Sequence, residues 1–366
     1  MKNTADLLCD MMRIKSVTTD IPEVNRCVAF VRETLVAEGL KCAVETFDGG
    51  RQALWASNVE GKKPDLMIVV HLDVVPVDSD SQFEPVIDGD TIRGRGSEDC
   101  KGNAMAAIEA LVQVAADKDS GASIGILFTT DEEMGGLTTA GMVARGYGAA
   151  KAALVYDAGG ESNIFIGQKG IVELRLVAEG KGGHASRPWA FDNPIFTLMA
   201  ALDKLRAHWE AKYPHAEGQE WHNSFAPCML SSGKAPNQIP DTATATINIR
   251  FIETSTPEAI VEEVREVTGL KVEPFAVSPC VFFPPDNPVV ETLSQVISES
   301  FGGVKVGHRR MNGATDARHL GNLGVPVAVS GIRGEGAHQA DESASLSSIK
   351  RFADIAAEFA RRLAKM

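Results

Sequence analysis

Four short runs of apolar residues constrain the fold of this chain more than any other feature of its sequence. They occupy residues 66–70, 124–128, 152–156 and 325–329. Each run is bounded by turn-forming residues and is too short for a buried helix, as is typical of strands buried on both faces of a sheet. Helical periodicity marks the segments 24–40 and 103–116 and the C-terminus. This alternation predicts an α/β fold with a mainly parallel sheet flanked by helices.

The segment 171–280 has a different pattern. Its expected elements are, in order, strand 171–177, helix 194–209, strands near Met229 and at 242–251, helix 257–267 and strand 272–277. This β-α-β-β-α-β order is ferredoxin-like. The helical pattern of the first kind resumes at 288–298. We therefore predict a discontinuous larger domain at 1–170 and 281–366, interrupted by an inserted domain at 171–280.

The composition excludes several classes of function. The 366 residues carry a formal charge of −13, which argues against nonspecific nucleic-acid binding and against an anionic membrane surface. No apolar run approaches a membrane span, and Asp6 and Asp10 interrupt the N-terminal apolar stretch, which therefore does not resemble a signal peptide. The six cysteines form no C-x-x-C pair and are expected to be reduced thiols. These features predict a cytoplasmic protein.

Polar residues follow three of the four apolar runs. His71 and Asp73 follow the first run, Glu132 and Glu133 the second, and Asp157 the third. Because ligands bind outside the carboxyl ends of strands in open α/β sheets, we expect these side chains to converge. Two further segments join them, the glycine-rich stretch 94–102 with Asp99 and the stretch 334–342 with His338.

Imidazoles and carboxylates without thiolates are suitable ligands for zinc, and also for cobalt or manganese. The set His71, Asp99, Glu133, Asp157 and His338 is large enough for two ions if Asp99 bridges them. Glu132 is then free to act as a general base, and Asp73 is placed to orient the His71 imidazole. The glycine-rich stretch matches neither the dinucleotide fingerprint nor the P-loop, so a nucleotide-dependent enzyme is disfavoured.

Each of these residues also has an ordinary structural interpretation. His71 and His338 are also compatible with hydrogen-bonded structural or loop histidines, and Asp99 and Asp157 with helix caps or turn residues. The Glu132-Glu133 pair would also suit a helix N-terminus. His208, His215 and His222 lie in a polar stretch, and we expect them to be exposed and without chemistry.

In this combination and order, the motifs resemble the co-catalytic zinc hydrolases that include carboxypeptidase G, aminoacylase, tripeptidase T and succinyl-diaminopimelate desuccinylase. The resemblance spans nearly the whole chain. It rests on the segments HLDVVP (71–76), GRGSEDCKG (94–102), TTDEEMGG (129–136), DAGG (157–160), GGHASRP (182–188), NQIPD (237–241), ATDAR (314–318) and HQADE (338–342).

The resemblance implies a role for each site residue. His71 and Asp157 would hold one zinc ion, Glu133 and His338 the other, with Asp99 bridging and Glu132 as base. It also implies a cis peptide bond after Asp99.

In the inserted domain, which the resemblance makes a lid, His184 would reach the transition-state oxyanion from the partner subunit of a homodimer. Asn237 and Arg250 would hold the substrate carboxylate. For Arg318, beside Thr315 and Asp316, two interpretations stay open, pocket lining and helix capping.

Asp157 separates two branches of the resemblance. Aspartate at this position resembles the aminopeptidase and dipeptidase branches, whereas the carboxypeptidase, desuccinylase and aminoacylase branches have glutamate. We therefore expect a two-metal amidohydrolase that cleaves a small peptide with a free carboxylate. The alternatives are an N-acyl-amino-acid deacylase, such as a desuccinylase or deacetylase, and an inactive peptide-binding protein of the same fold. Phe83 replaces a tryptophan common in relatives, so the shape of the pocket is not transferable.

Overall fold

The computed structural model describes residues 3–157, 160–218 and 220–366, and the chain divides into two compact units. The larger unit comprises Met1–Gly167, Phe282–Arg309 and Thr315–Met366. The smaller unit comprises Gln168–Val281 and Arg310–Ala314. The segment 171–280 therefore falls within the smaller unit, which also takes in a short later segment that the sequence pattern did not indicate.

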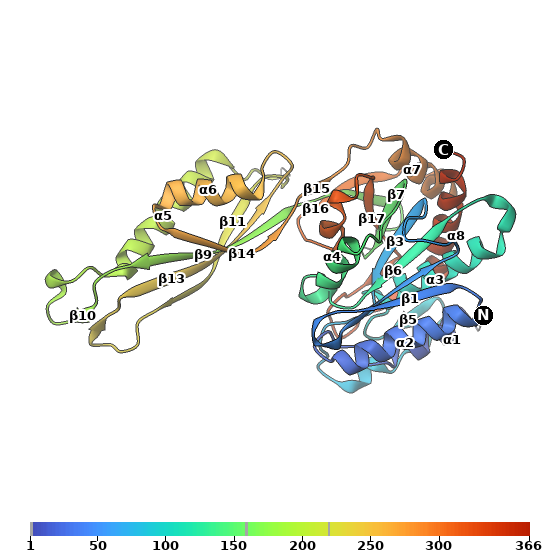
Figure 1. Cartoon of the computed structure of the whole chain (residues 1–366), viewed down its shortest axis with the longest axis horizontal. Helices are drawn as coiled ribbons and strands as arrows, with labels where there is room; N and C mark the ends of the chain where they lie inside the picture. The colour runs from blue at the N-terminus through green and yellow to red at the C-terminus, as the bar shows by residue number, and fades with distance from the viewer. Residues whose placement is uncertain (1–2, 158–159, 219) are drawn as a thin grey trace. The chain divides into compact units, whose positions relative to one another are not determined.

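A nine-stranded sheet organises the larger unit (Figure 1). Its central strands are parallel and follow the order β6-β3-β7-β17. They are β3 (Leu66–His71), β6 (Ile124–Thr129), β7 (Ala152–Tyr156) and β17 (Val327–Ser330). The outer strands are β1 (Lys41–Thr46), β2 (Gln52–Ser57), β8 (Asn163–Gln168), β15 (Val281–Phe282) and β16 (Gly307–Met311). The predicted α/β class with a mainly parallel central sheet is confirmed, and the four central strands coincide with the four apolar runs.

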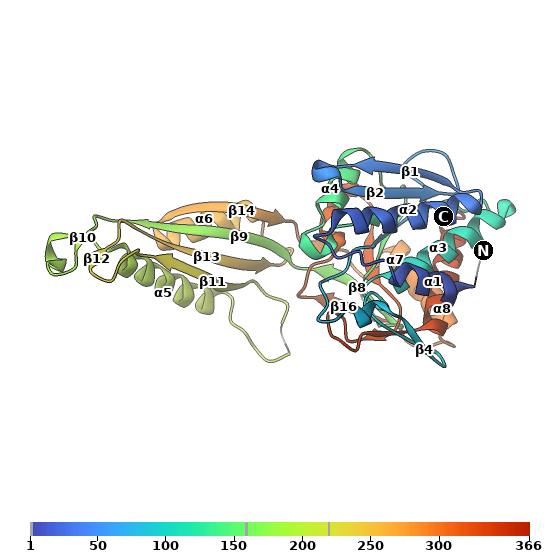
Figure 2. The same ribbon diagram turned by 90° about the horizontal axis from the view of Figure 1, so that it is seen from below.

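Helices flank this sheet. Helix α2 (Ile21–Ala37) packs along β1 and β2 (Figure 2), and α4 (Leu137–Ala144) packs against β2 and β6. Helix α3 (Lys101–Ala116) packs against β3 and β6 and contacts α1 (Thr4–Met12) and α8 (Leu346–Leu363). Helix α7 (Pro288–Ser300) contacts α8. No helix among the described residues combines the length and apolarity needed to cross a membrane.

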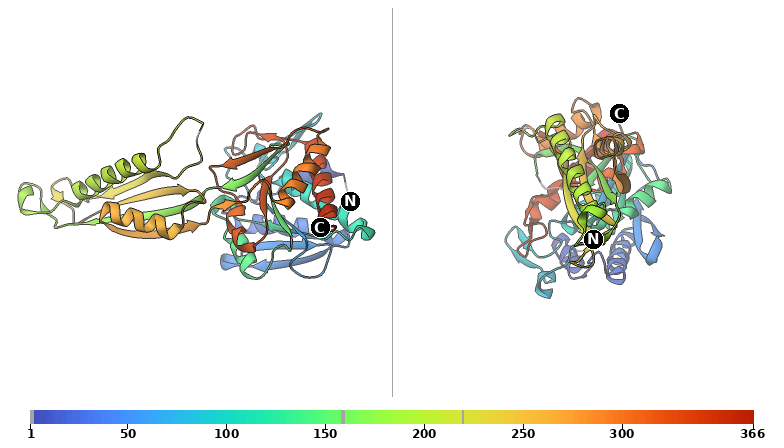
Figure 3. Two further views of the ribbon diagram at one scale, coloured as in Figure 1. Left: turned by 90° about the horizontal axis from the view of Figure 1, so that it is seen from above. Right: turned by 90° about the vertical axis from the view of Figure 1, so that its left-hand side faces the viewer.

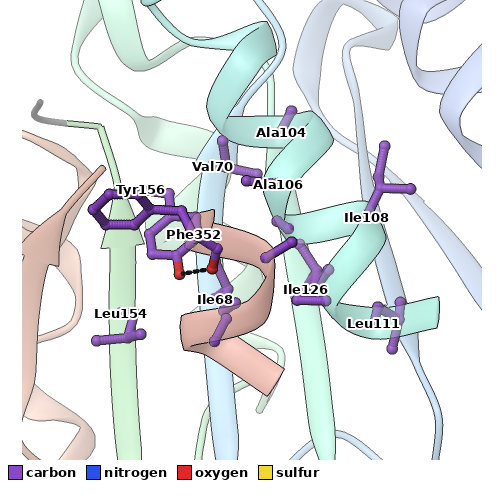
Figure 4. Packing of buried hydrophobic residues seen from close by; sticks show 14 of the residues in the cluster. Ile68, Val70, Ala104, Ala106, Ile108, Leu111, Ile126, Leu154, Tyr156 and Phe352 are labelled. Atoms are coloured by element: carbon purple, nitrogen blue, oxygen red, sulfur yellow. Dashed lines mark hydrogen bonds between the residues drawn. The ribbon is translucent and has the colours of Figure 1, made fainter. Parts of the chain in front are cut away.

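The core of the larger unit lies where α3 and α8 pack on the central strands (Figure 4). Ala104, Ala106 and Ala110 of α3 are fully buried, and their small side chains allow the helix to lie close to its neighbours. Tyr156, the last residue of β7, packs edge-on against Phe352 of α8, with ring centroids 5.9 Å apart. The Tyr156 hydroxyl also donates a hydrogen bond to the Phe352 carbonyl oxygen at 3.0 Å.

A small antiparallel sheet lies between the loops that carry Asp99 and His338. Its order is β18-β19-β5-β4, with bounds β18 (Gly334–Glu335), β19 (Ser343–Ser345), β5 (Thr91–Arg93) and β4 (Val86–Asp88). Strand β5 pairs with β19, and Arg93 lies opposite Ser343. The chain after Arg93 and the chain before Ser343 therefore emerge side by side.

The smaller unit is an antiparallel sheet covered by two helices. The strand order is β11-β13-β9-β14, with bounds β9 (Gly170–Glu179), β11 (Ser224–Ser232), β13 (Thr242–Phe251) and β14 (Lys271–Ser278). Helices α5 (Pro194–Lys212) and α6 (Pro257–Thr268) contact each other and the sheet (Figure 3). Strand β11 forms one edge of this sheet.

Candidate metal centre

The candidate metal centre begins at the carboxyl ends of the central strands. Because β6, β3 and β7 are parallel neighbours, they end at the same edge of the sheet. Strand β3 ends at His71, and Asp157 directly follows β7. Glu132 and Glu133 lie in a short 3-10 turn, η4 (Glu132–Met134), a few residues after β6. This edge therefore delivers four of the predicted site residues from three strands.

Asp99 lies between two histidines. Its Oδ1 atom is 2.9 Å from His71 Nε2, and its Oδ2 atom is 3.1 Å from His338 Nε2. Each carboxylate oxygen therefore faces a different imidazole, an arrangement that suits a carboxylate shared by two cations. The peptide bond between Asp99 and Cys100 is cis, as the resemblance implied.

The surrounding ligand atoms form two groups that share Asp99. His71, Asp99 and Asp157 belong to one group, with His71 Nε2 3.7 Å from Asp157 Oδ1. Asp99, Glu133 and His338 belong to the other, with His338 Nε2 3.1 Å from Glu133 Oε2. The other carboxylate oxygen of Glu133, Oε1, is buried and has no hydrogen-bond partner among the described residues. The side chains fall into the two groups that the expected ligand pairing requires.

The charges in this cluster favour a cation. Hydrogen bonding to Asp99 raises the pKa of His338 to about 9, outweighing partial burial, and Glu133 acts in the same direction. Burial raises the pKa of Glu133 to about 7, and repulsion from Asp99 adds to that shift. Glu133 therefore resists ionisation and His338 holds its proton more tightly, which indicates an excess of negative charge in the cluster. Divalent cations supply the positive charge that balances it, so the residues present fit the two ions that the donor set implies.

Cys100 also lies within reach of the first group, which sequence reasoning did not anticipate. Its Sγ atom donates to the Tyr156 carbonyl oxygen at 2.8 Å. Complete burial raises the thiol pKa far above its usual range, so Cys100 remains a neutral thiol. The hydrogen bond occupies its proton, and the donor set stays one of imidazoles and carboxylates.

Asp73 is fully buried and links three parts of the site. Its backbone carbonyl oxygen lies 2.9 Å from His71 Nδ1, whereas its carboxylate oxygen Oδ1 lies 3.4 Å from that nitrogen. Asp73 was expected to orient the imidazole, and the shorter of its two contacts with His71 comes from the main chain. The carboxylate instead accepts hydrogen bonds from the Thr18 hydroxyl at 2.8 Å and the Glu132 backbone N–H at 3.3 Å. It therefore helps to position the turn that carries Glu132.

Glu132 pairs with Arg318, for which the sequence left two roles open. Arg318 Nη2 lies 3.2 Å from Glu132 Oε1 and 3.3 Å from the Glu132 carbonyl oxygen. Only 7% of Arg318 is exposed, so the guanidinium lies against the turn and does not cap a helix. Burial raises the pKa of Glu132 to about 9, with repulsion from Asp157 and Asp316 adding to it and Arg318 opposing it. A cation at Asp157 would remove part of that repulsion.

The residues expected to contact substrate from the inserted domain lie at opposite ends of its sheet. His184 belongs to β10 (Gly183–His184), which pairs with β12 (Gln238–Ile239) just after Asn237. The Ala185 N–H donates to the Asn237 carbonyl oxygen at 3.0 Å. Arg250 lies near the far end of β13, a strand of 10 residues. At about 3.3 Å per residue, the part of β13 from Thr242 to Arg250 spans on the order of 25 Å. Asn237 precedes the Thr242 end of this strand, so Asn237 and Arg250 of one chain lie far apart.

His208 was expected to be exposed and without chemistry, but it is half-buried and lies 2.6 Å from Glu263 Oε1. Its ordered role is to join α5 to α6, which no local sequence pattern signals. Of the DAGG motif, Ala158 and Gly159 lie outside the described residues.

A cluster of histidines and carboxylates at the carboxyl edge of a parallel sheet is typical of metal-dependent hydrolases. Residues 67–362 match the sequence model of a protein family described as "Peptidase family M20/M25/M40". The chain belongs to this family and is an enzyme, a hydrolase of the metallopeptidase and amidohydrolase type.

Curated relatives of the chain include succinyl-diaminopimelate desuccinylases. The enzyme of Gluconacetobacter diazotrophicus is 30% identical over 329 residues, covering 82% of this chain and 81% of the relative. The enzyme of Acidiphilium cryptum is 27% identical over 367 residues, covering 94% of each chain.

Several similar solved structures are described as peptidases, and one is described as a "putative aminohydrolase". An M20 family metallo-carboxypeptidase from Sulfolobus solfataricus has a TM-score of 0.78, 18% identity and full coverage of both chains, 100% each. A dinuclear metal binding peptidase of the same family from Bacillus subtilis has a TM-score of 0.71 and 15% identity, covering 99% of this chain and 98% of that chain. At these sequence identities, the structural similarity shows only that the fold is shared.

Proposed function

We propose that this chain is a two-metal amidohydrolase that cleaves the peptide bond of a small peptide bearing a free carboxylate. The observation that carries the proposal is Asp99, whose two oxygens face His71 and His338 at 2.9 and 3.1 Å. The ligands suit Zn²⁺ best, with Co²⁺ and Mn²⁺ as alternatives. The dinuclear peptidase of Bacillus subtilis supports a count of two ions.

When bound, the two ions would polarise the scissile carbonyl group and lower the pKa of a water molecule between them. Glu132 takes the proton from the attacking water at its carboxylate and delivers it to the leaving amine nitrogen. Arg318 holds Oε1 of Glu132 from one side, and Asp73 holds its backbone N–H from the other. The base is therefore fixed beside the two ligand groups.

Two substrate classes are supported by different observations. Asp157 favours a short peptide, because the resemblance places aspartate here in the aminopeptidase and dipeptidase branches. The desuccinylase relatives favour a succinylated amino acid as the second candidate. Hydrolysis of di- and tripeptides, measured beside acetyl- and succinyl-amino acids, decides between them. A kcat/KM that is highest for a succinylated substrate would overturn the peptidase assignment.

The Glu132→Gln variant tests the mechanism. It should retain two ions per chain by elemental analysis and lose about 10²–10⁴-fold in kcat, the usual contribution of a general base. Glu84→Gln is the matched control, because the Glu84 side chain is 74% exposed and lies outside the cluster. A Glu132→Gln enzyme with wild-type turnover would show that another group is the base.

We further propose a homodimer formed through the inserted domain, with His184 and Asn237 acting at the partner's site. The separation of Asn237 from Arg250 supports this arrangement, because a second chain can bring the two ends together. The edge strand β11 also exposes Met229 and Leu230 by 68% and 67%. The cytoplasmic location and the absence of nucleic-acid and membrane partners stay predictions.

Mixing two inactive variants tests the shared site. In a random mixture of His184→Ala and Glu132→Gln chains, half of the dimers are mixed, and each mixed dimer has one intact site if His184 acts in trans. A quarter of all sites in the mixture are then intact, so the activity per mole of chain should recover to about a quarter of the wild-type value. Mixed dimers that stay inactive, with dimerisation verified by light scattering, would refute the arrangement.

A further inference from the structure

Glu342 lies outside the metal ligands but joins the two loops that carry them. It lies four residues after His338 and directly before β19, and only 1% of it is exposed. The sequence pattern gave it no role beyond its place in the HQADE motif. The β5–β19 pairing brings it against the loop that leads to Asp99.

Both oxygens of the Glu342 carboxylate are occupied by that loop. Oε2 accepts hydrogen bonds from Arg95 Nη1 at 2.6 Å and from the Gly96 N–H at 3.1 Å. Oε1 accepts from the Glu98 and Asp99 N–H groups, each at 3.0 Å. The carboxylate therefore binds one guanidinium and three main-chain donors.

These donors have few alternatives. The segment before α3 is not part of a strand or helix at Gly96, Glu98 and Asp99, and buried N–H groups require a partner. An ionised acceptor binds such groups about twice as strongly as a neutral one. The buried Arg95 beside it, 2% exposed, balances the charge of Glu342.

We propose that Glu342 is a positioning residue for the metal centre. By fixing the main chain of Asp99 relative to the loop that carries His338, its carboxylate sets the affinity of the site formed by Asp99, Glu133 and His338. This inference rests on the proposed two-metal function. It assigns to Glu342 no contact with substrate or with either ion.

The Glu342→Gln variant tests the negative charge of Glu342 separately from the size of its side chain. Glu342→Gln keeps the length of the side chain, but its NH₂ group replaces one acceptor oxygen. That group would face either the two N–H groups of Glu98 and Asp99 or those of Arg95 and Gly96, donor against donor. We expect the Zn²⁺ affinity of the site formed by Asp99, Glu133 and His338 to fall about 10–100-fold, the usual effect of losing a hydrogen-bond partner that supports a metal ligand.

The readout is Zn²⁺ binding to the full-length apoprotein, titrated against a chromophoric chelator, with activity measured across Zn²⁺ concentration. Added Zn²⁺ should restore most of the Glu342→Gln activity, which a general loss of folding would not permit. Amide exchange of segment 94–99 in the apoprotein should also become faster. Glu335→Gln is the matched control, because Glu335 is an exposed residue of the same loop region and should leave both readouts unchanged.

Different Zn²⁺-binding results would refute the two-metal function and the role of Glu342. A wild-type chain that binds no Zn²⁺ refutes the two-metal function. A wild-type chain that binds two ions, with a Glu342→Gln chain that binds both equally tightly, refutes only the role of Glu342. If Glu342→Gln does not fold, Arg95→Met replaces it. Weaker Zn²⁺ binding by that variant supports the inference, and unchanged binding overturns it.

Discussion

Tyr156→Phe isolates one buried hydrogen bond between the central sheet and α8. The Tyr156 side chain is fully buried directly before Asp157, and its hydroxyl donates to the Phe352 carbonyl oxygen at 3.0 Å (Figure 4). Burial raises the pKa of the hydroxyl far above its usual range, so it stays a neutral donor. Phenylalanine keeps the ring and its contact with Phe352 and removes only the donor.

The net loss from such a hydrogen bond is about 1 kcal/mol, because the unfolded chain regains a hydrogen bond to water. For a unit of this size, that corresponds to a decrease in Tm of about 2–4 °C. Tyr156→Ala also removes the ring and leaves a cavity, and should cost about 3–5 kcal/mol. The difference between the two variants separates the hydroxyl from the packing of the ring.

Calorimetry and denaturant unfolding of the apoprotein measure both variants. Zn²⁺ stoichiometry should stay at the wild-type value in Tyr156→Phe, because Asp157 keeps its strand. A Tyr156→Phe protein as stable as wild type would show that the hydroxyl contributes nothing. One as unstable as Tyr156→Ala would show that the hydroxyl, and not the ring, holds β7 against α8.

Three further changes have expected outcomes. Hydrogen bonds from Lys212, His208 and Tyr213 lower the pKa of Glu263 despite burial. Glu263→Gln should therefore lower the free energy of unfolding by about 1 kcal/mol at pH 7. The difference in Tm between the variant and the wild type should disappear as the pH falls through the lowered pKa of Glu263. Gly102→Ala would bring Cβ into a clash with the Ser97 carbonyl oxygen and should lower the free energy of unfolding by about 1–3 kcal/mol, whereas Gly313→Ala, with nothing within 4 Å, should change it little. Chelator treatment should lower Tm, since a ligand at 100 times its Kd stabilises by about 2.7 kcal/mol, and added Zn²⁺ should restore it. An unchanged Tm would contradict the metal site.

The sequence predicted the parallel core of the sheet because its strands are continuous apolar runs bounded by turns. It also predicted that His71, Glu133 and Asp157 converge, because residues that follow parallel strands share an edge. Asp99 and His338 lie in irregular loops, and the pairing of β5 with β19 that brings their loops together leaves no periodic signal in such short strands. The residue types in the two stretches indicated Asp99 and His338 as candidate ligands, but nothing local showed that the two loops meet, and the resemblance supported their inclusion.

Other features depended on long-range packing and were not predictable. Arg318 contacts Glu132 only because the turn η6 (Asp316–His319) packs beside β7 and β17. The four donors bound by Glu342 are main-chain groups and a distant arginine, which no motif records. The separation of Asn237 from Arg250 follows from β13 running straight between them, although the residues are close in sequence.

The spread of the metal ligands along the chain has a consequence for synthesis. The first ligand, His71, emerges from the ribosome 267 residues before His338. A nascent chain thus displays Asp99 and Glu133 long before the imidazole that completes their site exists. Metal capture by the second group is therefore a late event in biogenesis. Truncation before His338 removes both this ligand and α8, so it leaves the centre incomplete and the core without the helix that packs against α3.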